Sequence, residues 1–145
     1  RRAFKIRNAY SDYFWQYKHF NAAAAYLHKA LLILKTLTDS QTEKAISYSN
    51  LASIYIVLEN MEDAENYAKK AVEIFRTEVG EEDVHYSAAL CTLGEVHFAK
   101  GEYAQAEELF SEALRLIARD YGTENDSYKV VERNLNLSRE KNGGK

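Results

Sequence analysis

The sequence predicts an all-α protein, a right-handed α-solenoid of three helix pairs followed by a C-terminal capping helix. Apolar residues recur every three or four positions along the whole chain, which is the spacing of helices that bury one face. The 145 residues include no proline, so the composition contains no strong interrupter of long helices. The chain also repeats itself at an interval of 42 residues, and a unit of this length holds two helices that stack on their neighbours.

Seven helices are expected from the apolar spacing and the breaks between helical runs. They cover about residues 2–17, 21–37, 42–59, 61–79, 84–100, 102–121 and 125–141. Gly80, Gly101 and Gly122 each follow a helical run, where a left-handed residue commonly ends a helix. Residues 40–43 have the pattern of a capping box, and residues 123–126 have a weaker form of it. The short joints predict antiparallel helix hairpins.

The repeated residues divide the chain into units. Leu51 and Leu93, Ala64 and Ala106, Ala71 and Ala113, Gly80 and Gly122, and Tyr86 and Tyr128 each stand 42 residues apart. We therefore expect a single array over residues 1–142, with units at about 4–40, 42–81 and 84–122, a capping helix at 125–141, and a disordered tail at 143–145. The chain begins with Arg1, so we expect it to be a piece of a longer protein.

The residues shared by the units resemble those of a known family. The third unit carries Leu90, Leu93-Gly94, His97, Gly101, Tyr103, Ala106, Phe110 and Ala113 at the positions of a tetratricopeptide repeat (TPR). The second unit matches at Leu51-Ala52 and Tyr55 but departs at Glu59, where glycine is common. The long period is similar to that of kinesin-light-chain repeats. The resemblance covers residues 4–142, and it implies a non-catalytic protein-interaction module without a cofactor.

Composition and charge exclude several classes of function. There are 19 Lys and Arg against 22 Asp and Glu, and this mildly acidic balance does not fit a nucleic-acid binder or a protein that binds anionic membranes. The apolar runs at 22–34 and 46–58 are shorter than the roughly 20 residues that span a bilayer. The single cysteine, Cys91, cannot form an internal disulfide, so we expect a cytoplasmic protein.

The sequence lacks the common motifs of catalysis and of metal binding. It contains no GxGxxG, no Walker-type GK[ST], no HExxH and no GxSxG. The four histidines and the cysteine have no spacing typical of metal ligands. We therefore expect no catalytic residue, no metal and no cofactor.

The candidate binding surface comes from the TPR resemblance, which implies that the first helix of each pair lines a concave groove. Placing Leu51, Ala52 and Tyr55 in the core puts other residues on the groove side at 100° per residue. The candidate groove residues are Lys5, Asn8, Asp12, Trp15, Ser49, Asn50, Ser53, Ile56, Thr92, Glu95, Phe98, Arg133 and Asn134.

Two features of this surface suggest how it is used. Trp15, Ile56 and Phe98 occupy equivalent positions and form an apolar stripe, which either anchors a partner or fills the space between repeats. Asn50 and Asn134 stand where this family often places an amide that pairs with a peptide main chain. The leading interpretation is a module that binds a peptide segment of a partner protein. The alternatives are a structural spacer or self-association scaffold, and a peptide-sensing regulatory domain.

Overall fold

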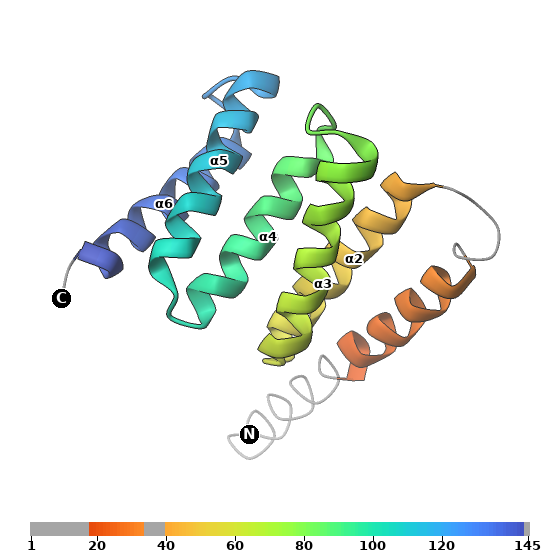
Figure 1. Cartoon of the computed structure of the whole chain (residues 1–145). Coiled ribbons are helices and arrows are strands. Elements are labelled where there is room, and N and C mark those ends of the chain that lie inside the picture. Colours follow the sequence, from red (N-terminus) through yellow and green to blue (C-terminus); the bar gives the residue numbers. More distant parts are fainter. Residues whose placement is uncertain (1–17, 34–39, 144–145) are drawn as a thin grey trace, which may run out of the picture.

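The computed structural model describes residues 18–33 and 40–143, and within these ranges the ordered elements are helices. Residues 18–33 are helical, and the elements that follow are α2 (Gln41–Val57), α3 (Met61–Ile74), a π-helical turn η1 (Phe75–Val79), α4 (His85–Ala99), α5 (Tyr103–Tyr121) and α6 (Asp126–Gly143). Figure 1 shows these helices stacked side by side, with the helix at residues 18–33 at one side of the stack and α6 at the other.

The stack is an α-solenoid built from helix pairs. α2 packs on α3 and α4 packs on α5, so each pair is a helix hairpin, and α4 also contacts both helices of the preceding pair. α6 is the last helix of the described ranges and packs mainly on α5. The predicted all-α repeat architecture is therefore confirmed. Within the described ranges, no helix is both long and apolar enough to cross a membrane.

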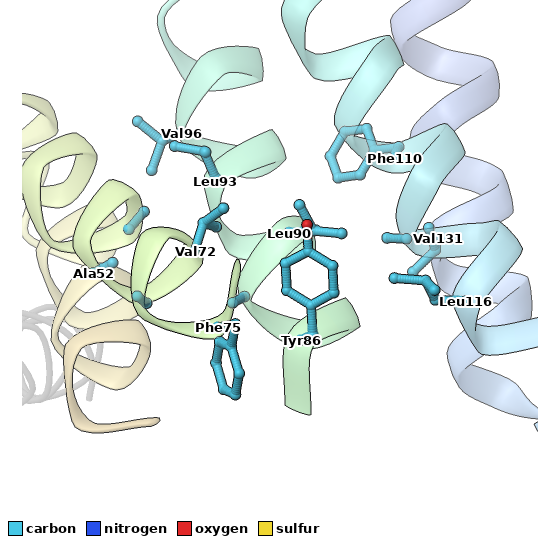
Figure 2. Close-up of a cluster of buried hydrophobic side chains, with 14 of the residues drawn as sticks. Ala52, Val72, Phe75, Tyr86, Leu90, Leu93, Val96, Phe110, Leu116 and Val131 are labelled. Atoms are coloured by element: carbon cyan, nitrogen blue, oxygen red, sulfur yellow. The ribbon is translucent and has the colours of Figure 1, made fainter. Parts of the chain in front are cut away.

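One apolar core runs through the pairs. Figure 2 shows Leu90 of α4 between Val72 of α3 on one side and Phe110 of α5 on the other, with Val131 of α6 beyond. Five alanines at which the paired helices meet are all fully buried. They are Ala52, Ala64, Ala71, Ala106 and Ala113. Burial of this kind on the predicted faces is the main source of stability in a helical repeat.

Repeating polar contacts link neighbouring units. The Lys100 ammonium, after α4, donates a hydrogen bond to the Glu65 carboxylate on α3. One repeat later, the Nδ2 of Asn142 donates to Oε1 of Glu107 at 3.5 Å. Both members of the second pair stand 42 residues after the first, so the period extends to side-chain contacts.

Aromatic residues attach the first described helix to the second unit. The Nε2 of His28 lies 3.0 Å from the hydroxyl of Tyr55. The His28 ring also meets the Tyr67 ring edge-on, with centroids 5.5 Å apart, and Tyr67 in turn stacks on Tyr48 and Tyr55. These contacts dock residues 18–33 against both α2 and α3.

Several helix ends differ from the prediction. Residues 18–20 are already helical, so His19 lies within a helix and not at a joint. The run expected to end at residue 79 changes to a π-helical turn after Ile74, where the Gly80 amide donates to the Phe75 carbonyl at 2.7 Å. α6 continues through Gly143, and near its end Asn142 donates a hydrogen bond to Glu107 on α5. Residues 144 and 145 of the expected tail lie outside the described ranges.

The caps also differ. Ser40 precedes α2 as expected, but its side chain makes no capping hydrogen bond. Ahead of α6 the cap is Asn125, whose Oδ1 accepts a hydrogen bond from the Tyr128 amide at 2.7 Å. Thr123 is therefore not the capping residue. The side chain of Asn60 caps α3 in the same way, accepting from the Asp63 amide at 3.2 Å.

Candidate functional site

A groove runs between α4, the first helix of its pair, and α6, the last described helix. We call it the α4–α6 groove and define it by two hollows that share Glu95. The larger hollow has a volume of about 450 Å³ and is lined by Val84, Ser87, Ala88, Cys91, Thr92, Glu95, Ile117, Tyr121, Asp126, Ser127, Val130 and Val131. The smaller hollow has a volume of about 150 Å³ and is lined by Glu95, Phe98, Phe110, Asn134 and Leu137.

The groove exists because α6 docks on α5 and leaves a gap toward α4. Ile117 and Phe110 of α5 are buried and lie beneath the two hollows. α2 and α4, by contrast, contact each other directly. Between them, Oγ of Ser49 donates a hydrogen bond to Oγ1 of Thr92 at 3.4 Å, and both side chains are buried.

The structure brings four of the predicted groove residues together. Thr92 and Glu95 line the larger hollow, and Glu95, Phe98 and Asn134 line the smaller one. Arg133 is exposed on α6 but lines neither hollow. Their part in binding remains a prediction.

The candidates on α2 lie outside the two hollows. Asn50 and Ser53 are exposed, whereas Ser49 is buried against α4 and its placement favours packing between repeats. Ile56 is half-buried and packs against the core. The predicted residues Lys5, Asn8, Asp12 and Trp15 lie outside the described ranges.

The described residues of the apolar stripe, Ile56 and Phe98, bear on whether it anchors a partner or fills the space between repeats. Phe98, like Ile56, packs against the core, and its ring meets that of Tyr103 edge-on with centroids 5.1 Å apart. Phe98 also lines the smaller hollow, so its ring both fills space between helices and forms part of the groove wall.

Electrostatics in the groove centre on Glu95. The side chain is open to solvent, yet the atoms of the surrounding helices desolvate its carboxyl and raise its pKa above the ordinary value. Burial, with a smaller contribution from the charge of Glu95, raises the pKa of Cys91 to about 12. The Cys91 thiol is therefore protonated at neutral pH and is a poor nucleophile.

Sequence reasoning missed the ends and the floor of the groove. Val84 and Ser87 lie up to about two turns before Thr92, the first predicted residue of α4, and Asp126 and Ser127 lie about two turns before Arg133 in α6. Extending each predicted face by two turns would have found them. The floor residues of α5 needed the angle between α4 and α6, which no local pattern contains.

The described residues hold no cluster of three or more His, Cys, Asp or Glu side chains that could bind a metal ion. His97 fills the position that Tyr55 has one repeat earlier, and its Nδ1 lies 2.7 Å from Oε1 of Glu102. The hydrogen bond to His97 lowers the pKa of the Glu102 carboxyl, which is a structural pairing at the joint between α4 and α5.

Comparison with known proteins agrees with the all-α repeat fold. The family model of the tetratricopeptide repeat matches residues 43–119, which is more than half of the chain. A crystal structure of Podosopora anserina kinesin light chain nearly identical TPR-like repeats superposes with a TM-score of 0.79 at 20% identity, covering 88% of this chain and 61% of that one. A point variant of the same repeats gives a TM-score of 0.79 at 22% identity, with the same coverage.

BtubC (BKLC) from P. vanneervenii is also similar, with a TM-score of 0.75 at 23% identity, covering 87% of this chain and 51% of that one. The chain thus spans between half and two thirds of the length of these solved structures. No curated protein sequence matches it.

Proposed function

Because the chain belongs to the tetratricopeptide repeat family, whose repeats are generally protein-interaction modules, we propose that it binds a peptide segment of a partner protein in the α4–α6 groove. The observation that carries the proposal is the larger hollow of about 450 Å³, a size typical of ligand pockets. Its floor and walls combine apolar side chains with a few polar ones, as specific recognition sites do.

The chemistry of the groove suits an extended or short helical peptide. Val130, Val131 and Ile117 offer apolar surface for an anchor side chain. Asn134, beside the smaller hollow, carries an amide that both donates and accepts hydrogen bonds, so it can pair with a main chain of any sequence. Micromolar affinity is expected, because ordering a flexible peptide offsets much of the contact energy.

The test is a peptide-display selection on the folded chain with two matched variants. Ala88→Trp places an indole in the larger hollow, whereas Ala104→Trp places one on the exposed part of α5. Peptides selected on the wild type should lose binding to Ala88→Trp and keep it with Ala104→Trp. Equal binding to the two variants would place the site elsewhere, and no selected peptide at all would reject the proposal.

A second candidate function is self-association, which one observation favours. The helix at 18–33 leaves Tyr26, Leu32 and Ile33 exposed by 74%, 65% and 54%, and apolar residues gathered on one helix are typical of interfaces. Sedimentation from low to high micromolar concentration should then reveal an assembly that Leu32→Gln with Ile33→Gln dissociates. A mass that stays monomeric throughout would reject it.

The remaining alternatives concern context. A spacer role and a peptide-sensing regulatory role are both compatible with a TPR array, and a cytoplasmic location is proposed from the lone Cys91 alone. The Ala88→Trp comparison separates the spacer from the two binding roles, because a spacer has no groove-dependent ligand.

A further inference from the structure

The charged side chains that line the α4–α6 groove are all acidic. They are Glu95 and Asp126, and no lysine, arginine or histidine lines either hollow. Ile117 and Tyr121, which line the larger hollow from α5, add no positive charge. The groove-side residues of α2 that neighbour α4, such as Asn50 and Ser53, also carry no charge.

Glu95 differs from the other carboxylates of the described part of the chain that are held between helices. Glu65 is paired with Lys69 and Lys100, and Glu107 lies 3.7 Å from Arg139. Within the described ranges, Glu95 has neither an ion pair nor a hydrogen bond, and desolvation is the cause of its raised pKa. A carboxylate that has lost part of its hydration without gaining a cation is a poor arrangement for the free protein, and a ligand cation would correct it.

The position of Glu95 defines where such a cation would sit. It is the one residue common to both hollows, so a side chain that reaches it lies between two apolar depressions. In an extended peptide, side chains two positions apart point the same way. A basic residue at Glu95 therefore directs an apolar neighbour into the larger hollow.

We propose that the peptide bound in the α4–α6 groove carries a lysine or arginine that pairs with Glu95, with an apolar residue two positions away in the larger hollow. The inference rests on the proposed function and adds the chemistry of the ligand. An acidic segment or a free C-terminal carboxylate would meet Glu95 and Asp126 as like charges, which disfavours both as ligands. A charge-assisted hydrogen bond from lysine or arginine is among the stronger polar contacts available to a surface groove.

The experiment is a selection from a random nonapeptide library on wild type, Glu95→Gln and Glu95→Lys, with Glu108→Gln as the control carboxylate on the exposed face of α5. Wild type and Glu108→Gln should enrich lysine or arginine with an apolar residue two positions away. Glu95→Gln should lose the basic preference and keep the apolar one, and Glu95→Lys should move the preference to aspartate or glutamate at that position.

Titration calorimetry of one selected peptide then isolates the ammonium. Replacing its lysine by norleucine, which keeps the methylene chain, should weaken binding to the wild type about tenfold and leave binding to Glu95→Gln unchanged. An equal loss on both proteins would overturn the inference. Selected peptides that bind in the groove but lack a basic residue would also overturn the inference, while leaving the proposed function intact. The proposed function itself would be overturned if no peptide selected on the wild type lost binding to Ala88→Trp. It would also be overturned if the chain formed a homodimer that Ala88→Trp dissociates.

Discussion

Gly94 and Phe110 lie so close that a Cβ built on Gly94 would stand 2.8 Å from Cε1 of the phenylalanine ring. The equivalent positions one repeat earlier are Ala52 and Ala68, both fully buried. In the third unit, glycine on α4 thus faces phenylalanine on α5. In the second unit, alanines on α2 and α3 occupy the two equivalent positions.

This relationship predicts that the effect of Gly94→Ala depends on residue 110. In the wild type the added methyl overpacks the ring, which costs about 1–3 kcal/mol and outweighs the roughly 1 kcal/mol that alanine gains over glycine in a helix. In a Phe110→Leu background the ring atoms near Gly94 are gone, so Gly94→Ala should be neutral or stabilising. Urea denaturation of the four proteins measures the coupling, and additive effects would show that the contact is not as close as described.

Glu59 predicts a stabilising substitution. It has a φ of 62°, the left-handed conformation that Gly101 adopts one repeat later with a φ of 81°. A non-glycine residue pays roughly 1 kcal/mol there, so Glu59→Gly should stabilise the fold by about 0.5–1 kcal/mol after allowing for the greater freedom of glycine when unfolded. Gly101→Ala is the mirror experiment and should destabilise by a similar amount. If Glu59→Gly destabilised the fold or Gly101→Ala stabilised it, the loop must relax to another conformation in the variant.

Glu65 predicts sensitivity to acid. Hydrogen bonds from Lys100 and then Lys69 lower the pKa of its carboxyl from 4.5 to about 2. A lowered pKa means that the pairing stabilises the fold above pH 4.5 and that this contribution is lost as the pH falls toward 2. The lysines are partly exposed, so Glu65→Gln should cost only about 0.5–1 kcal/mol at pH 7. Its deficit in urea denaturation should shrink between pH 4.5 and pH 2, and a deficit independent of pH would contradict the assignment.

Glu95 predicts the opposite dependence. Its pKa is raised, so the folded chain holds a proton that the unfolded chain has released, and stability falls as the pH rises through the interval between the two pKa values. The titratable groups that share the groove, Cys91, Tyr121 and Asp126, provide no cation to offset this. Glu95→Gln should therefore melt at a higher temperature than wild type at pH 7 and at nearly the same temperature at pH 4. A lower melting temperature at pH 7 would indicate a favourable partner for the carboxylate.

The helical period and the 42-residue repeat were enough to predict the fold. Buried alanines such as Ala64 and Ala106 occupy equivalent places because close approach of paired helices tolerates little else there. Local chemistry was less predictable: the serine at 40 has a capping sequence pattern without the capping hydrogen bond, while Asn125 caps α6. Serine, threonine and asparagine all cap helices, and the path of the loop decides between them.

The site could be predicted only in part. Helical-wheel arithmetic placed Glu95 and Asn134 on the groove side, where both line a hollow. It could not distinguish Ser49 from its sequence neighbour Asn50. Ser49 is buried where α2 meets α4 and makes a hydrogen bond there, whereas Asn50 is exposed. That difference depends on how far apart successive first helices stand, which is a tertiary property.

The most direct test of the α4–α6 groove as the proposed recognition surface is amide chemical-shift mapping by NMR, with a peptide from the display selection titrated into the labelled chain. The perturbed amides should cluster between residues 84 and 98, in and just before α4, and between residues 126 and 137 in α6, with α3 unchanged. Perturbations concentrated on α3 or on residues 18–33, with the amides around Glu95 and Asn134 unmoved, would contradict it.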